Sequence, residues 1–101
     1  MHHAVILDPR DTVATAIVPV LQDTEAVCVR TTHTVVIRVQ EFIPLGHKVA
    51  VKMHQSGDLI YKYGFPIGQA TQDIPVGSWV HVHNLKGLRA QGRRENVQAE
   101  D

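Results

Sequence analysis

Apolar positions along the chain fall in short runs rich in valine and isoleucine, and most runs end near glycine, proline, aspartate or asparagine. Such runs are typical of β-strands, because β-branched side chains suit a pleated and partly buried surface. The pattern predicts strands at about residues 4–7, 12–18, 26–30, 34–39, 48–53, 59–62, 67–70 and 80–83. Strands that recur every 8–12 residues or so, with turn residues between them, predict a compact all-β domain.

Two segments depart from the strand pattern. Residues 19–25 are the one candidate for a helix, but their proline and short length favour a loop or a single turn. Residues 85–101 are polar and nearly without bulky apolar side chains, so they cannot bury enough surface to offset the entropy of ordering. We therefore expect a domain over residues 1–88 and a mobile polar tail over residues 89–101.

One turn and the strand that follows it occur twice. Residues 43–51 and 74–82 share the form Ile-Pro-x-Gly-x-x-Val-x-Val, 31 positions apart. Proline fixes φ at the entry to the turn, and glycine supplies the position with positive φ. Two copies predict a pseudo-symmetric fold, since a solenoid needs about three repeats. Chance similarity between two proline-glycine turns is the alternative.

Composition narrows the classes of function. The chain has 101 residues, enough for one domain, and its 10 basic residues are balanced by 10 acidic ones. A neutral chain lacks the positive charge of a nucleic-acid binder, and no apolar run approaches the roughly 20 residues that span a bilayer. The N-terminus does not resemble a signal peptide, and the single cysteine, Cys28, lies in an apolar run. We expect a cytoplasmic protein with a buried, inert thiol.

Histidines are the first candidates for chemistry. His81 and His83 flank Val82 on a predicted strand, so their side chains should leave the same face of a sheet. Two such imidazoles can share a divalent metal or bracket an anion. The spacing alone favours the simpler interpretation, an edge strand with two solvated or hydrogen-bonded histidines. A metal needs further ligands, for which His47 and His54 are available. Otherwise we expect His54 to lie on the surface of a turn.

Two lysines form a second group of candidates. Lys48 follows His47 directly after the first proline-glycine turn, where a cation and nearby backbone N–H groups can meet a carboxylate. Lys62 lies between Tyr61 and Tyr63, and the default expectation is that both rings pack in the core while the lysine faces solvent. A surface role is the alternative for each lysine. No complete active site is visible in the sequence.

Three segments, in this order, resemble the N-terminal module of altronate and galactarate dehydratases. They are Ile-Pro-Leu-Gly-His-Lys-Val-Ala-Val at 43–51, Lys-Tyr-Gly-Phe-Pro-Ile-Gly-Gln-Ala at 62–70 and Ile-Pro-Val-Gly-Ser-Trp-Val-His-Val-His-Asn at 74–84. Residues 8–14, Asp-Pro-Arg-Asp-Thr-Val-Ala, are similar to the opening of that module. The resemblance covers about residues 5–88, and only strand character matches over residues 18–41.

The resemblance implies a β-clip fold of the SAF type. It also implies an enzyme that removes water from a C6 aldonate or aldarate and gives a 2-keto-3-deoxy acid, with a divalent metal such as iron or manganese. Long members of the family carry a much larger catalytic domain after this module. We therefore expect the chain to be a small subunit, inactive alone, that caps the active site of a separate large catalytic lyase subunit.

Carried over residue by residue, the resemblance implies roles for two groups. The His-x-His-Asn ending suggests metal ligands, and the two middle motifs suggest contacts to an acidic sugar, although they can equally serve the fold or a subunit interface. The metal-ligand candidates are His81 and His83, and the substrate-binding candidates are His47, Lys48, Lys62, Tyr63 and Asn84.

Two other functions stay open. The sequence also resembles the small subunit of sulfolactate sulfo-lyase, which would make sulfite rather than water the leaving group. A stand-alone binding or assembly module is the third reading, because one fold can serve unrelated functions.

Overall fold

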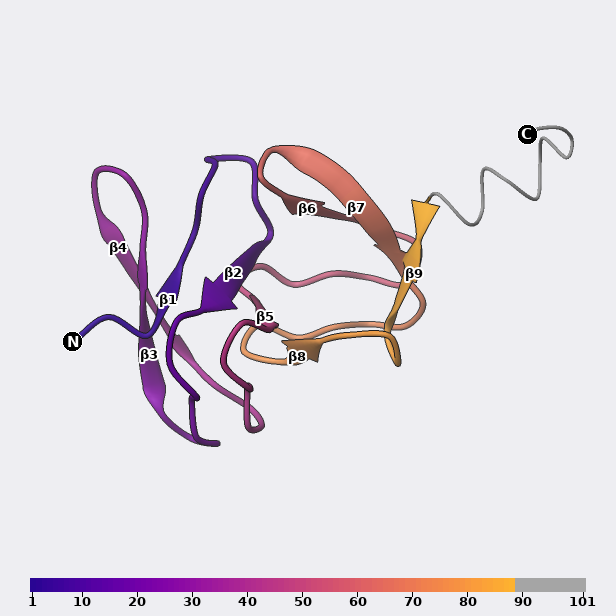
Figure 1. Cartoon of the computed structure of the whole chain (residues 1–101). Helices are drawn as coiled ribbons and strands as arrows, with labels where there is room; N and C mark the ends of the chain where they lie inside the picture. The colour runs from indigo at the N-terminus through magenta and orange to yellow at the C-terminus, as the bar shows by residue number, and fades with distance from the viewer. Residues whose placement is uncertain (89–101) are drawn as a thin grey trace, which may run out of the picture.

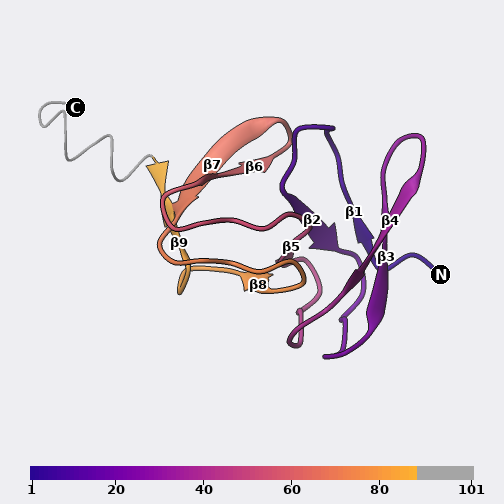
Figure 2. The same cartoon turned by 180° about the vertical axis from the view of Figure 1, so that it is seen from behind.

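A computed structural model describes residues 1–88, and β-strands form their regular elements, which confirms the prediction of an all-β fold. Figures 1 and 2 show the β3–β4 hairpin at one end of the domain and the β6–β7 hairpin at the other, with short strands between them. The strands are β1 (Ala4–Val5), β2 (Val13–Ala16), β3 (Glu25–Val29), β4 (Thr34–Arg38), β5 (Lys48–Ala50), β6 (Leu59–Lys62), β7 (Phe65–Ala70), β8 (Trp79–Val80) and β9 (Leu85–Gly87).

The strands form two sheets. Six of them follow the order β4-β3-β1-β2-β5-β8, and the other three follow the order β6-β7-β9. Only the β1–β3 pair is parallel, and the remaining pairs are antiparallel. Antiparallel strands can be joined by short connections, which is why nine strands fit into the 88 described residues.

The two sequence repeats lie side by side. Lys48 pairs with Val80, and Val49 pairs with Trp79, in the antiparallel β5–β8 ladder. In the sequence alignment of the repeats, Lys48 corresponds to Trp79 and Val49 to Val80. Exchanging the two repeats therefore reproduces the same pairing. The expected pseudo-symmetry is confirmed, and its axis passes between β5 and β8.

The same symmetry relates the loops. In the first half, the Asp23 N–H donates to the Val39 carbonyl, and in the second half the Gly57 N–H donates to the Ala70 carbonyl, both at 2.8 Å. Asp23 and Gly57 also share a positive φ, of 68° and 96°. Each half thus consists of a strand, a tight turn, a hairpin and a proline-glycine turn.

His54 is explained by this duplication. It forms an antiparallel bridge with Ile74, as Val20 does with Ile43 in the other half. His54 thus occupies a valine-like core position and is 2% exposed. The prediction that it decorates a turn was wrong, because the polar residues after it resemble a turn whereas its own side chain points inward.

Several predicted boundaries also change. The strand expected at residues 80–83 ends at Val80, and residues 81–84 form a turn instead. A strand that the sequence pattern did not predict, β9 at Leu85–Gly87, pairs with β7 at the end of the domain. Residues 19–25 contain no helix, as predicted. The predicted mobile tail at residues 89–101 lies outside the described residues.

The buried apolar side chains form two clusters. One contains Ile43 and Val49, and the other contains Ile74 and Val80. Cys28 is fully buried in the first cluster, and burial raises the pKa of its thiol to about 11. The predicted burial of this thiol is confirmed, and the raised pKa disfavours the reactive thiolate. Among the described residues, no helix is long and apolar enough to cross a membrane.

Candidate functional site

The side chain of Asn84 ends β8 and shapes the turn that follows. Its Oδ1 accepts a hydrogen bond from the His81 N–H, and its Nδ2 donates to the Trp79 carbonyl, both at 2.9 Å. Asn84 is 3% exposed, so these two hydrogen bonds satisfy a side-chain amide that is buried. Asparagine competes effectively with strand ladders because its side chain bonds nearby backbone groups. The turn, rather than strand alternation, therefore positions His81 and His83.

Trp79 gathers the histidines around one ring system. The His81 ring stacks on the indole with centroids 5.0 Å apart and planes 8° apart. His83 and His47 lie tilted against the same indole, with centroid distances of 5.3 and 5.6 Å. His47 and His81 are also neighbours, at 4.9 Å. The structure thus brings together three of the histidines that the sequence singled out.

The indole N–H of Trp79 donates to Nδ1 of His47 at 3.1 Å. Because Nδ1 accepts this bond, a neutral His47 ring carries its hydrogen on Nε2. The tautomer is inferred from the hydrogen bond. His47 therefore keeps an Nε2–H donor that can serve a ligand.

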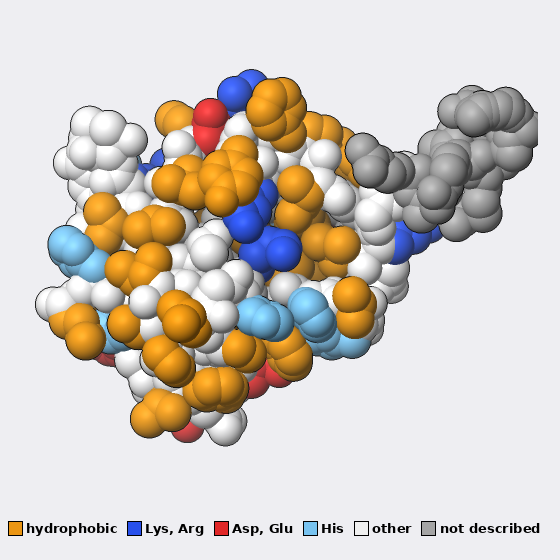
Figure 3. All heavy atoms as spheres, in the orientation of Figure 1, with side chains coloured by type: hydrophobic (Ala, Val, Ile, Leu, Met, Phe, Trp, Pro, Cys, Tyr) orange, Lys and Arg blue, Asp and Glu red, His pale blue; other side chains and the backbone are white. Residues whose placement is uncertain are grey.

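Two lysines complete a positively charged surface beside these rings. Burial lowers the pKa of Lys48, and the neighbouring Lys62 lowers it further. Partial burial likewise lowers the pKa of His81, as do His47, Lys48 and His83 around it. Figure 3 shows pale-blue histidine side chains beside blue lysine or arginine side chains on the face that carries β5 and β8. We call these five residues the histidine–lysine cluster: His47, Lys48, Lys62, His81 and His83.

Tyr63 and Gly64 form the turn of the β6–β7 hairpin beyond Lys62, and both have positive φ. The Lys62 ammonium lies 4.9 Å from the centroid of the Tyr63 ring. Tyr63 is 54% exposed, so the expectation that this ring packs in the core was wrong. A positive φ turns its side chain away from the sheet.

Asp11 anchors this turn through two hydrogen bonds. Its carboxylate accepts from the N–H of Tyr63 at 3.0 Å and from that of Gly64 at 2.8 Å, and the residue is 1% exposed. A Cβ on Gly64 would come within 2.7 Å of the Asp8 carboxylate and 2.6 Å of the Arg10 guanidinium. The opening motif and the Lys-Tyr-Gly motif are therefore one packed unit.

The described residues do not by themselves form a metal site. Nowhere in residues 1–88 do three His, Cys, Asp or Glu side chains lie close enough to hold one ion. His47 has one ring nitrogen engaged by Trp79, and His81 is stacked on the same indole. Metal binding by His81 and His83 stays a prediction that requires ligands from elsewhere. The roles predicted for His47, Lys48, Lys62, Tyr63 and Asn84 in substrate binding likewise stay predictions.

Two residues of the site were missed in the sequence. Trp79 organises the histidines, and Asp11 holds the hairpin turn that carries Tyr63. Trp79 could have been identified from the repeats, because its position in the second repeat corresponds to that of Lys48 in the first. No local pattern marks Asp11, because its partners lie 52 and 53 positions away.

Comparison with known proteins identifies the family of this chain. Residues 2–88 match the altronate/galactarate dehydratase SAF domain family. An altronate dehydratase from Bacillus subtilis is 52% identical over 54 residues, which are 54% of this chain and 11% of that protein. The (2R)-sulfolactate sulfo-lyase subunit alpha from Paracoccus pantotrophus is 49% identical over 47 residues, which are 46% of this chain and 70% of the relative.

A second altronate dehydratase, from Escherichia coli, is 36% identical over 76 residues, which are 75% of this chain and 14% of that protein. The chain thus spans a small part of these altronate dehydratases and most of a sulfo-lyase alpha subunit.

Proposed function

Because the chain belongs to the altronate/galactarate dehydratase SAF domain family, we propose that it is the small subunit of an altronate dehydratase-like hydro-lyase. In this proposal it caps the active site of a separate large subunit, which carries the main catalytic machinery. The product is a 2-keto-3-deoxy acid. Relatives named as a subunit support the two-chain arrangement, since this chain aligns with 70% of one of them.

The observation that carries the proposal is the gathering of basic side chains in the histidine–lysine cluster. The neighbouring charges that shift the pKa values of Lys48 and His81 are all basic, and none raises either pKa. Glu41 accepts a hydrogen bond from the Trp79 N–H at 3.0 Å and is not among the charges that shift either pKa. An anionic ligand would relieve this repulsion, and the carboxylate of an aldonate is such a ligand.

Each residue then has a role that follows from its contacts. Lys48 and Lys62 supply charge for the carboxylate, and His47 and His81 offer ring N–H groups to oxygens of the sugar. Tyr63 borders the cluster beside Lys62. Asn84 acts through the turn, because both ends of its amide already bind backbone groups. Removal of the proton next to the carboxylate is assigned to a base on the partner chain.

We assign the divalent metal to the interface between the two chains. His83 and His81 are the candidate ligands on this side, and the remaining ligands come from the large subunit, since residues 1–88 supply no third one. Iron and manganese both accept imidazole ligands. Metal analysis of the separate chain and of the two-chain complex tests this: the complex should hold the ion and the chain alone should not.

The main experiment is reconstitution of the two-chain enzyme and assay of altronate dehydration. Replacing Lys48→Ala or Lys62→Ala should raise KM for altronate by about tenfold or more, because a charge-assisted contact is lost. Lys52→Ala is the matched control, since Lys52 is exposed and lies outside the cluster. Unchanged kinetics in both cluster variants would refute the substrate role. Failure of the chain to bind any large lyase subunit would refute the subunit role and leave a stand-alone module.

Sulfolactate is the second candidate substrate, and the similarity to two sulfo-lyase alpha subunits favours it. The same complex distinguishes the two reactions. Release of sulfite from sulfolactate, without dehydration of altronate, would assign the chain to a sulfo-lyase instead.

A further inference from the structure

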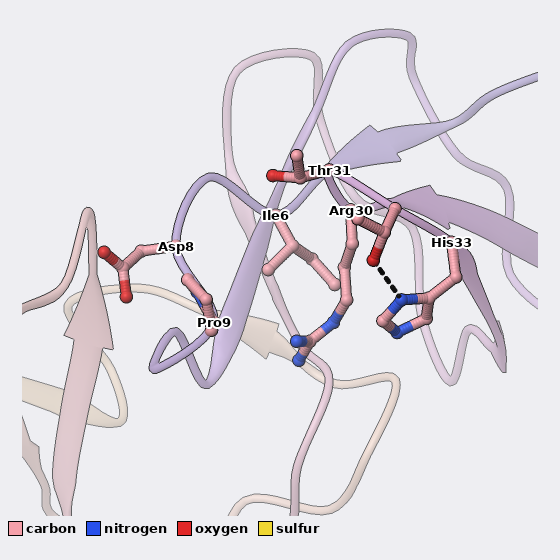
Figure 4. A pocket seen from close by; sticks show the side chains of 7 residues that line it. Ile6, Asp8, Pro9, Arg30, Thr31 and His33 are labelled. Atoms are coloured by element: carbon pink, nitrogen blue, oxygen red, sulfur yellow. Dashed lines mark hydrogen bonds between the residues drawn. The ribbon is translucent and has the colours of Figure 1, made fainter.

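A second feature lies away from the histidine–lysine cluster. A cavity of about 170 Å³ opens between the turn of the β3–β4 hairpin and the loop after β1, and Arg30 and Ile6 line it (Figure 4). In the six-stranded sheet, β1 and β2 separate β3 from β5. The cavity is therefore distinct from the surface around Trp79, and the proposed function makes no use of it.

Arg30 carries a charge that nothing in residues 1–88 balances. Its Nε is buried and has no hydrogen-bond partner, and its side chain makes no ion pair with a described residue. Asp8 is the one carboxylate that lines the cavity, but Arg10 occupies it. The backbone N–H of Arg10 donates to Asp8 at 2.9 Å, and its guanidinium at 3.1 and 3.3 Å. Figure 4 shows the Asp8 carboxylate pointing away from Arg30.

The walls of the cavity define what could enter. Ile6 and Pro9 give it an apolar side, and the Arg30 guanidinium lies between Pro9 and His33 (Figure 4). The rim is polar, since the Thr32 hydroxyl contacts Nδ1 of His33 at 3.1 Å. The volume is on the order of the 150 Å³ or so that holds a benzene molecule, which corresponds to about six heavy atoms.

From this combination we infer that the cavity binds a carboxylate carried by a short apolar body, with Arg30 as its charged partner. A guanidinium offers two parallel N–H groups that match the two oxygens of a carboxylate, while Ile6 and Pro9 cover the hydrocarbon. A dianion such as phosphate fits less well, because Asp8 lies at the edge of the cavity. The carboxylate belongs either to a small organic acid or to an acidic side chain of another protein.

Titration of the full chain with butyrate tests this inference. The backbone amide signals of Thr31 and His33 and the methyl signals of Ile6 should shift saturably, while butylammonium should leave them unchanged. Arg30→Gln should weaken butyrate binding by about tenfold or more. His81→Ala should leave it unchanged, which separates this site from the histidine–lysine cluster. The amide spectrum of each variant verifies that the fold is intact.

A blocked peptide with one glutamate side chain, titrated in parallel, distinguishes the two sources. Tighter binding of butyrate identifies a small organic acid, and tighter binding of the peptide identifies an acidic side chain of a partner. Absence of saturable shifts with both probes would overturn the inference. Equal binding to the native chain and to the Arg30→Gln variant would overturn it as well. Neither result bears on altronate dehydration.

Discussion

At the scale of single residues, His54 shows how a core can tolerate a titratable group. Both of its ring nitrogens are buried without hydrogen-bond partners. Burial lowers the pKa of His54, and both the charge of Asp58 and the nearby backbone of Lys52 oppose this shift without reaching hydrogen-bond geometry at the ring. A neutral imidazole in a valine-like position costs stability because its polar groups lose their contacts with water.

This residue should make stability depend on pH. The unfolded chain takes up a proton on His54 below about pH 6.5, whereas the folded chain resists it to a lower pH. The free energy of unfolding should therefore fall as pH decreases below about 6.5, by at most about 1.4 kcal/mol per pH unit for this group. Urea denaturation at several pH values measures the slope.

His54→Val is the decisive comparison, since Val20 fills the equivalent position in the other half. This variant should lose most of the slope and gain stability at pH 5 relative to the native chain. His81, whose pKa is also lowered, should retain a smaller part of the slope. Identical slopes in the variant and the native chain would show that His54 does not titrate on unfolding.

At the scale of elements, the β6–β7 hairpin depends on one buried carboxylate. Asp11→Ala would leave the N–H groups of Tyr63 and Gly64 without their acceptor. The expected loss of unfolding free energy is about 2–4 kcal/mol, and Asp11→Asn should lose less because it keeps one acceptor. Hydrogen exchange should accelerate at Tyr63 and Gly64 and stay unchanged in the β3–β4 hairpin. Equal acceleration in both hairpins would indicate a global effect.

The two proline-glycine turns provide a matched pair of substitutions. Gly46 and Gly77 have φ of 83° and 91°, and each donates its N–H to an alanine carbonyl at 2.8 Å. A Cβ at Gly46 would meet open space, so Gly46→Ala should cost only the strain of positive φ, about 1–2 kcal/mol. A Cβ at Gly77 would overlap the carbonyl oxygen of Arg38. Gly77→Ala should therefore cost clearly more in urea denaturation, and equal costs would contradict this account.

The elements also show what the sequence could reveal. Short β-branched runs predicted most strands, because alternation and turn residues are local signals. The end of β8 was missed, since Asn84 ends that strand through its side-chain hydrogen bonds and not through a turn dipeptide. The approach of Lys48 to Lys62 could not be predicted from the sequence either, because it depends on how the β6–β7 hairpin lies relative to β5. Single residues of the site could be named, but not their convergence on Trp79.

At the scale of the whole molecule, one strand contributes adjacent residues to both core clusters. Val49 belongs to the first cluster and Ala50 to the second, both within β5. A strand that serves both clusters couples them, so we expect the domain to unfold in one cooperative transition.

Equivalent core substitutions test this coupling. Ile43 and Ile74 occupy the same position in the two repeats and are 0% and 1% exposed. Ile43→Val and Ile74→Val should each lower the free energy of unfolding by about 0.5–1.5 kcal/mol, within a single transition seen by both fluorescence and circular dichroism. Separate transitions for the two probes would show that the halves unfold independently.

The pairing of β5 with β8 has a consequence for how such a surface can arise. If two identical half-chains met at this axis, every contact across it would occur twice between the same two residue types, so a change in one partner would alter both copies. Joining the halves in tandem lifts that restriction, so the indole N–H of Trp79 can donate to His47 of the other repeat without a matching bond on the opposite side. Each copy of the repeat could then acquire different binding residues, as His47 and His81 show, on one shared scaffold.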